Sequence, residues 1–247
     1  YALAEQVNLN KTVTIVGAGD GTVIRFAGDA IGTPIFRVMA PNVCIRNVKL
    51  QNKQGTNSQQ TSLVRAGTTD NASGLVLDNV TFDSAFQGVA VYAAKDTASN
   101  AETSRGITII NSRFTNLNGK AIYLEKGSDV TIRNNTFESC GAADYASSSG
   151  IDINLKHGDY SDYQISGNRF VGDPSFPGGA ILLKARDDGD YSSPAATVTG
   201  IEITGNTFEG FGANKLVLGE PDKGNKGPAD SEITHDLAAA DITDNRA

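Results

Sequence analysis

The chain has 247 residues, which is enough for one large domain with a substantial core. Its 21 basic and 28 acidic residues give a net charge of −7. This balance argues against nucleic acid as the main partner, because phosphate binding requires a positive field. No long apolar run occurs, so we expect no membrane insertion. The chain opens at Tyr1 without a methionine or a visible signal peptide, and we expect a mature protein or an excised fragment.

One sequence pattern recurs along the chain, which indicates a solenoid. A loose copy is VTIVGAGDG at 13–21, and the clearer copies are VCIRNVKL (43–50), LVLDNVTF (75–82), ITIINSRF (107–114), VTIRNNTF (130–137), YQISGNRF (163–170) and IEITGNTF (201–208). A last copy, ADITDNRA, occupies 240–247. The uneven spacing fits a unit of about 20–25 residues with variable insertions.

Each copy alternates apolar and polar residues, as a half-buried strand does. Asn or Gly follows, and both tolerate the left-handed backbone of a corner. A Phe usually comes three residues later. Stacked in register, the Asn side chains are expected to hydrogen-bond from coil to coil, and the Phe rings are expected to form an internal column.

A second strand follows in each unit, usually after Gly or another small residue. These strands are GVAVYAA (88–94), GKAIYLE (119–125), GIDINLK (150–156), GAILLKA (179–185) and NKLVLGE (214–220). We therefore predict an all-β fold, a right-handed parallel β-helix of about eight coils forming a single domain over 1–247. Long polar insertions at 52–73, 95–105, 141–149, 187–199 and 220–236 are expected to form loops that wall a binding face.

The VTIRNNTF type of repeat resembles the pectate-lyase-like superfamily over about residues 10–247. The opening YALAEQVNLNKTVTIVGAGDGTVI is similar to the first coils of β-helix domains in bacterial secreted or surface-layer-associated proteins. The resemblance implies that the chain is a fragment of a larger secreted or surface protein, with an extracellular or cell-surface location in a bacterium. It is specific for the fold and not for a function.

Several motifs that suggest chemistry are better explained by the repeat. GAGDG (17–21) lacks the third glycine and the following helix of a dinucleotide site, and we expect it to form a corner. Cys44 and Cys140 fall three coils apart, about 14 Å at the strand spacing, which is too far for a disulfide, so two buried thiols are expected. The dipeptides HG (157–158) and DD (187–188) are also found in polygalacturonase-type hydrolases, but there they follow each other along the chain in the opposite order, which disfavours this activity. GTPIFRVMAPNVCIRNVKLQN (32–52) resembles an early coil of pectin methylesterases, whose acidic motifs have no match downstream.

The second strands place aromatic, amide and charged side chains on the outside of the predicted solenoid. Aligning the strands by their buried residues gives a first outward column of Tyr92, Tyr123, Asn154, Leu182 and Val217. The next column contains Ala94, Glu125, Lys156, Lys184 and Gly219, and just beyond it lie Lys95, Lys126, His157, Arg186 and Glu220. Tyrosine faces stack on sugar rings, amides bind hydroxyls, and cations bind carboxylates or sulfates.

This row predicts a track for an acidic polysaccharide or cell-surface glycan. Its expected substrate-binding residues are Tyr92, Tyr123, Asn154, Lys95, Lys126, Glu125 and Asp152. The alternative is an ordinary solvated strand face with cross-strand charge pairs.

Glycoside hydrolysis and β-elimination are the two candidate chemistries for this row of side chains. Glycoside hydrolysis needs two carboxyl groups about 5–9.5 Å apart, whereas the alignment sets Asp152 and Glu125 about 14 Å apart along the strand. β-Elimination of a uronic-acid polymer fits the residue types better, because a lysine among other cations has a lowered pKa and can take the proton beside the carboxylate. The catalytic candidates are Lys156, Lys184, Arg186 and His157, with His157 or Tyr123 as proton donor. No lyase motif matches residue by residue.

No cofactor is required by this hypothesis, although Ca²⁺ is a candidate ligand of Asp187, Asp188 and Asp190 in RDDGDY (186–191), which supply clustered hard oxygens. Three functions stay open: a polysaccharide lyase, a non-catalytic carbohydrate-binding or adhesive module, and a structural spacer. The domain is expected to be monomeric.

Overall fold

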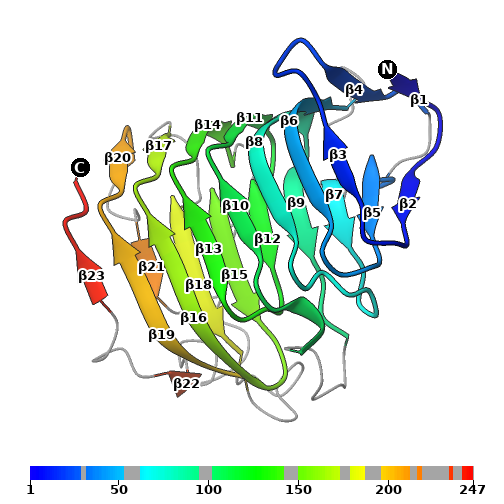
Figure 1. The fold of residues 1–247 in the computed structure, drawn as a ribbon. Coiled ribbons are helices and arrows are strands. Elements are labelled where there is room, and N and C mark those ends of the chain that lie inside the picture. The colour runs from blue at the N-terminus through cyan, green and yellow to red at the C-terminus, as the bar shows by residue number, and fades with distance from the viewer. Residues whose placement is uncertain are drawn as a thin grey trace.

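The computed structural model describes residues 1–28, 32–52, 62–94, 102–141, 150–172, 179–186, 196–211, 216–218, 234–235 and 241–246. These residues form parallel strands that stack side by side along one axis, with the two termini at opposite ends (Figure 1). Within this described part, no helix has the length and apolar character needed to cross a membrane. The predicted all-β solenoid is confirmed.

Each coil contributes strands to as many as three sides of the solenoid, and the first two sides form one continuous sheet, here called sheet A. The first side comprises β3 (Thr14–Val16), the first halves of β6 (Cys44–Gln51) and β8 (Val76–Ala85), β10 (Thr108–Ile110), β13 (Val130–Arg133), β16 (Asp159–Ser166), β19 (Thr197–Thr204), β22 (Thr234–His235) and β23 (Asp241–Thr243). The second side comprises β1 (Ala2–Leu3), β4 (Val23–Phe26), the second halves of β6 and β8, β11 (Arg113–Leu117), β14 (Thr136–Cys140), β17 (Arg169–Val171) and β20 (Thr207–Glu209).

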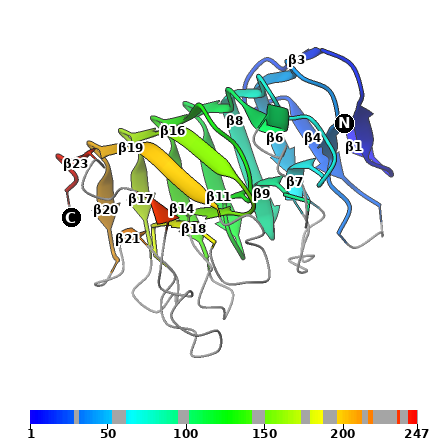
Figure 2. The same ribbon diagram turned by 90° about the horizontal axis from the view of Figure 1, so that it is seen from below.

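The third side is a separate sheet, here called sheet B, with eight strands among the described residues. It comprises β2 (Val7–Leu9), β5 (Phe36–Val38), β7 (Ser62–Ala66), β9 (Gln87–Val91), β12 (Ile122–Leu124), β15 (Ile151–Leu155), β18 (Ile181–Ala185) and β21 (Leu216–Leu218). A short 3₁₀ helix, η1 (Glu102–Ser104), precedes β10. Figure 2 shows the same stack from below, with the N- and C-terminal coils again far apart. The predicted number of about eight coils agrees with this sheet.

A column of residues with left-handed backbone forms the corner between the two sides of sheet A. Its members are Asn47, Asn79, Asn111, Asn134, Gly167, Gly205 and Asp244, with φ between 52° and 64°. Asn, Asp and Gly tolerate this conformation better than other residues. The corners predicted from the repeat are therefore confirmed.

The interior of the coils holds two stacked columns. Phe82, Phe114, Phe137, Phe170 and Phe208 stack with ring centroids 4.5–5.3 Å apart, as predicted. The buried amide ladder, however, comes from the residue after the corner: Asn135, Asn168, Asn206 and Asn245. In each step one Nδ2 donates to the next Oδ1 at 2.9–3.0 Å and also to a backbone carbonyl. The corner asparagines bond across coils only at the surface, as in Asn79 Nδ2 to Asn47 Oδ1.

Gly88 near the start of β9 and Gly150 just before β15 lie against the Phe column, which leaves no room for a side chain there. A Cβ on Gly88 would lie 2.8 Å from the Phe114 ring, and one on Gly150 would lie 2.9 Å from the Phe170 ring. The predicted GAGDG corner is also confirmed, because its backbone connects β3 to β4 and donates from Gly19 N to the carbonyl oxygen of Asn47.

The two cysteines form no disulfide, as predicted. Cys140 is buried at the end of β14, and burial raises the pKa of its thiol to about 12. Cys44 begins β6 and is only half-buried, so the expectation of two buried thiols holds for one of them. Both fit the role of small hydrophobic residues rather than reactive groups.

One predicted loop contains a strand. The insertion expected at 52–73 includes β7, which pairs in parallel with β5 and β9. Its sequence SLVRA buries Leu63, Val64 and Ala66, and its short length hid the period-two signal among polar neighbours.

Candidate functional site

The outward face of sheet B is the part of the solenoid that carries buried polar chemistry. In β9, β12, β15 and β18 every residue is buried, so both faces of these strands are covered. The inward residues, such as Ile122 and Leu124, belong to the apolar core. The outward residues include the buried polar and charged side chains Glu125, Asp152, Asn154, Lys156 and Lys184. The alternative prediction of an ordinary solvated strand face does not describe this region, because these side chains are buried.

The strand register differs from the sequence alignment by two residues between β9, β12 and β15. Tyr123 lies beside Ala90 and Asp152, not beside Tyr92 and Asn154. Between β15 and β18 the register also differs by two residues, because Asn154 lies beside Lys184 and not beside Leu182. The alignment used buried apolar residues, but a shift of two keeps every residue on its own face, so alternation alone cannot choose between the two registers.

The corrected register also removes the reason given against paired carboxylates. Asp152 lies opposite Tyr123, two positions before Glu125, so the two acidic residues are offset by about 7 Å along the strand rather than about 14 Å. Each carboxylate is, however, held by its own lysine, as follows.

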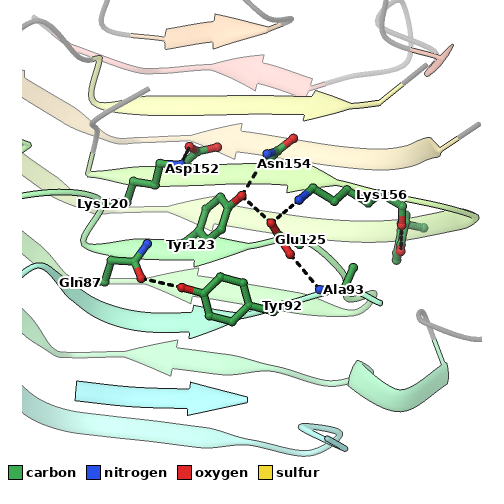
Figure 3. A network of polar contacts seen from close by, with 10 residues as sticks. Gln87, Tyr92, Ala93, Lys120, Tyr123, Glu125, Asp152, Asn154 and Lys156 are labelled. Carbon is green, nitrogen blue, oxygen red and sulfur yellow. Dashed lines mark hydrogen bonds and ion pairs between the residues drawn. The ribbon is translucent and has the colours of Figure 1, made fainter. Parts of the chain in front are cut away.

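Glu125 is the centre of one polar network (Figure 3). Its Oε1 accepts hydrogen bonds from the Tyr123 hydroxyl at 2.6 Å and from Lys156 Nζ. Its Oε2 accepts from the backbone N–H of Ala93 at 3.0 Å. The Tyr123 oxygen in turn accepts from Asn154 Nδ2 at 3.1 Å. The neighbouring sheet B strands β9, β12 and β15, with the residues just after them, thus fix one carboxylate.

Tyr123 is held as a neutral hydrogen-bond donor. Burial, followed by the negative charges of Glu125 and Asp152, raises the pKa of its phenol well above the usual value. Each of these influences disfavours a phenolate. Tyr123 can therefore donate a proton in a hydrogen bond at neutral pH but cannot serve there as a base.

A second ion pair lies on the other side of the Tyr123 ring. Lys120 Nζ is 2.9 Å from Asp152 Oδ2 and 3.9 Å from the centre of the Tyr123 ring. The contact with Asp152 has the distance of an ion pair without hydrogen-bond alignment, because neither carboxylate oxygen has a hydrogen-bond partner among the described residues. Lys120 therefore balances the charge of Asp152.

Two buried acceptors on this face have unused capacity. Asp152 is 0% exposed, and within the described residues neither its oxygens nor Asn154 Oδ1 receives a hydrogen bond. Buried acceptors are nearly always satisfied by protein or by an ordered water, so such atoms need an explanation. Hydroxyl groups are donors of the required kind.

Tyr92 extends this network toward the N-terminal coils and is only half-buried. Its hydroxyl donates to Gln87 Oε1 at 3.0 Å, and the same oxygen accepts from Ser62 at 3.1 Å. The ring meets Tyr123 edge to face at 5.8 Å, while the guanidinium of Arg65 lies 4.7 Å from its centre. Tyr92 is thus an aromatic group fixed at its ring and at its hydroxyl.

Lys126 does not belong to this network. It is 0% exposed, and its Nζ donates to the carbonyl oxygens of Thr68 and Asp70 at 3.2 Å and to Thr103 Oγ1 at 3.0 Å. Burial lowers its pKa, with Asp70 and Glu125 opposing the shift. Lys126 holds the segment after β7 against the coil below it, which is a structural contact.

The remaining candidates gather beyond Glu125. Lys184 is 2% exposed and neighbours Asn154, while the backbone of Arg186 donates to Leu155 and so places Arg186 beside Lys156. His157 is buried with a left-handed backbone, and its carbonyl oxygen accepts from the Tyr160 hydroxyl. The strand register thus brings these positions together on one face, while the side chain of Lys156 is paired with Glu125.

Some predicted residues cannot be placed. Lys95 and the candidate calcium ligands Asp187, Asp188 and Asp190 lie outside the described residues. Within the described part of the chain, no three His, Cys, Asp or Glu side chains gather as a metal site.

The sequence analysis missed Lys120, Gln87 and Arg65. Lys120 lies two residues before β12, and Gln87 is the first residue of β9, so the period-two pattern had not begun at either position. Arg65 lies in β7, which was taken for a loop. A search for charged residues just before each repeat of the second strand would have found Lys120.

Comparison with known families agrees with this architecture. A family model described as "Right handed beta helix region" matches residues 26–214. Neither the curated proteins nor the solved structures contain a match to the chain.

Proposed function

We propose that this chain, which belongs to the right-handed β-helix family, is a module that recognises an acidic polysaccharide on the outward face of sheet B. The observation that carries the proposal is the fixed aromatic group of Tyr92, held between Arg65 and Tyr123 at the accessible end of a buried polar network. Burying such a network costs free energy, and functional sites are where proteins commonly retain this cost.

The residue types match the chemistry of sugars. Tyrosine rings bind the apolar faces of sugars, and carboxylate and amide oxygens accept hydroxyl hydrogen bonds. Because β9, β12, β15 and β18 are buried on both faces, the polymer would meet this network at the half-buried Tyr92. We extend the proposal to an extracellular or cell-surface location in a bacterium, where such polymers occur.

The test is binding of soluble alginate, pectate, chondroitin sulfate and heparin, with neutral dextran for comparison, in the presence and absence of calcium. Tyr92→Ala should weaken binding of the preferred acidic polymer by about 1–2 kcal/mol, through loss of the stacking surface. Tyr1→Ala is the matched control, because Tyr1 is an exposed aromatic at the far N-terminal end. Equal affinity of wild type and Tyr92→Ala would remove this face from consideration.

β-Elimination is a second candidate, favoured by the gathering of Lys184 and Arg186 beside Asn154 and Lys156. Ultraviolet absorbance of the unsaturated uronate product would reveal it on the same polymers. Lys184→Ala should then abolish the signal while the protein stays folded. Binding without product would support an adhesive module, and neither binding nor product would support a spacer.

A further inference from the structure

We infer that a pocket beside Arg37 and Arg65, at the N-terminal end of the sheet B face, binds the carboxylate or sulfate group of an acidic sugar. This inference rests on the proposed function and specifies where the acidic group of the sugar binds. The pocket has a volume of about 280 Å³, and its lining includes Gln6, Thr33, Arg37, Arg65 and Thr68.

The first argument is the placement of two like charges. Arg37 and Arg65 are direct neighbours on the paired strands β5 and β7. Two cations side by side on adjacent strands repel each other and destabilise the sheet unless an anion lies between or near them. The pair therefore indicates a position where negative charge is favoured.

The second argument is that the nearby carboxylate of Asp70 binds Arg37 and not Arg65. Asp70 accepts from Arg37 Nε at 2.8 Å, from Arg37 Nη2 at 3.0 Å and from the backbone N–H of Gly67 at 2.6 Å. This fork fixes the Arg37 guanidinium and raises its pKa, chiefly through the hydrogen bonds to Asp70. Among the described residues, no carboxylate pairs with Arg65, whose guanidinium contacts the ring of Tyr92.

The third argument is the local charge. Lys126 is anchored to the carbonyl oxygens of Thr68 and Asp70, close behind the pocket. The pocket lining holds two arginines, Arg37 and Arg65, and the Asp70 carboxylate is bound to the first of them, although the whole chain carries a net charge of −7. A positive region on an acidic protein attracts anionic ligands selectively.

The pocket is continuous with the proposed sugar track through side chains already in contact. Arg65 lies on Tyr92, and Tyr92 meets Tyr123, which is bonded to Glu125. A sugar stacked on Tyr92 would thus have its acidic group within reach of a guanidinium. Arginine suits this role because its planar fork matches carboxylate and sulfate oxygens.

The experiment compares Arg65→Gln with Arg133→Gln, which removes the same charge from an exposed position on β13. Arg65→Gln should weaken binding of the preferred acidic polymer about tenfold, the usual effect of losing a charged hydrogen bond, while Arg133→Gln binds as wild type does. Arg65→Lys keeps the charge but loses the fork, so it should fall between them. Thermal unfolding of each variant checks that the fold is intact.

A second arm uses small anions and keeps the inference separate from the proposed function. Sodium glucuronate and sodium sulfate are titrated while the backbone amide NMR signals of Gly67 and Thr68 are followed. Shifts with glucuronate alone identify a carboxylate site, and shifts with sulfate alone identify a sulfate site; both should vanish in Arg65→Gln.

If wild type binds the polymer and Arg65→Gln binds equally well, the pocket is overturned while the proposed function stands. If no polymer binds, the proposed function fails, and the pocket fails with it only when both small anions also leave these signals unmoved.

Discussion

An ion-pair ladder on sheet A and the Lys156–Glu125 pair on sheet B differ in how deeply their charges are buried. On sheet A, Arg113, Glu138, Arg169 and Glu209 form a ladder of ion pairs along β11, β14, β17 and β20. These arginine side chains are about half exposed, at 56% and 47%. On sheet B, Lys156 and Glu125 make the same kind of pair at 10% and 8% exposure.

This difference in exposure determines how much each ion pair contributes to stability. An exposed pair keeps most of its hydration and contributes little to stability, whereas a buried pair gives up its hydration and depends on its partner. The ladder on β11, β14, β17 and β20 is therefore an ordinary solvated one, while the Glu125 network on sheet B holds its polar groups in fixed positions, as a recognition face requires.

The largest expected effect comes from breaking the buried pair. Lys156→Met should lower the free energy of unfolding by about 3–5 kcal/mol, because Glu125 would stay buried without its cation. Urea denaturation measures this loss. The double variant Glu125→Gln/Lys156→Met removes both charges and should recover much of the stability. A single-variant loss below about 1 kcal/mol would show that this face is as well hydrated as sheet A.

The next largest effect is expected at alkaline pH, where the buried phenol of Tyr123 should make the free energy of unfolding depend on pH. The folded pKa of Tyr123 is raised, so above about pH 10 the unfolded chain loses a proton that the folded chain keeps. The free energy of unfolding therefore falls as pH rises, by about 1.4 kcal/mol per pH unit for each such tyrosine. Tyr160 and Tyr163, whose pKa values burial also raises, contribute in the same direction.

Tyr123→Phe isolates one of these contributions. Its stability should fall less steeply with pH in this range than that of wild type, by the slope of one proton. Urea denaturation at several alkaline pH values gives both slopes. Identical slopes would mean that the Tyr123 phenol titrates normally in the folded state.

The smallest effect is expected on sheet A. Arg113→Met removes one member of the exposed ladder and should change the free energy of unfolding by less than about 1 kcal/mol. Added salt should reduce even this change, because it screens exposed charges. A loss as large as that of Lys156→Met would erase the distinction between the two faces.

The sequence predicted the architecture well because the features that define it repeat in every coil. The Phe column, the left-handed Asn and Gly corners and the alternating strands are periodic, so each copy supports the others. Residues that occur once, such as Lys120 and Arg65, have no such support. Their roles depend on which neighbouring side chains they meet.

Register and burial were the two quantities that the pattern could not supply. A shift of two residues preserves the alternation, and the core packs apolar residues at both Ile151 and Ile153, so Tyr123 was placed beside the wrong neighbours. Burial of the outward face depends on tertiary contacts rather than on strand period. Polar residues such as Lys184 were therefore expected at the surface and are buried.

The most direct test of the central claim is hydrogen exchange of wild-type protein with and without the acidic polymer that it prefers. Binding to the sheet B face predicts slower exchange in β7, β9, β12 and β15, with β11, β14 and β17 of sheet A unchanged. Protection confined to the sheet A strands, or no protection by any acidic polymer, would contradict it.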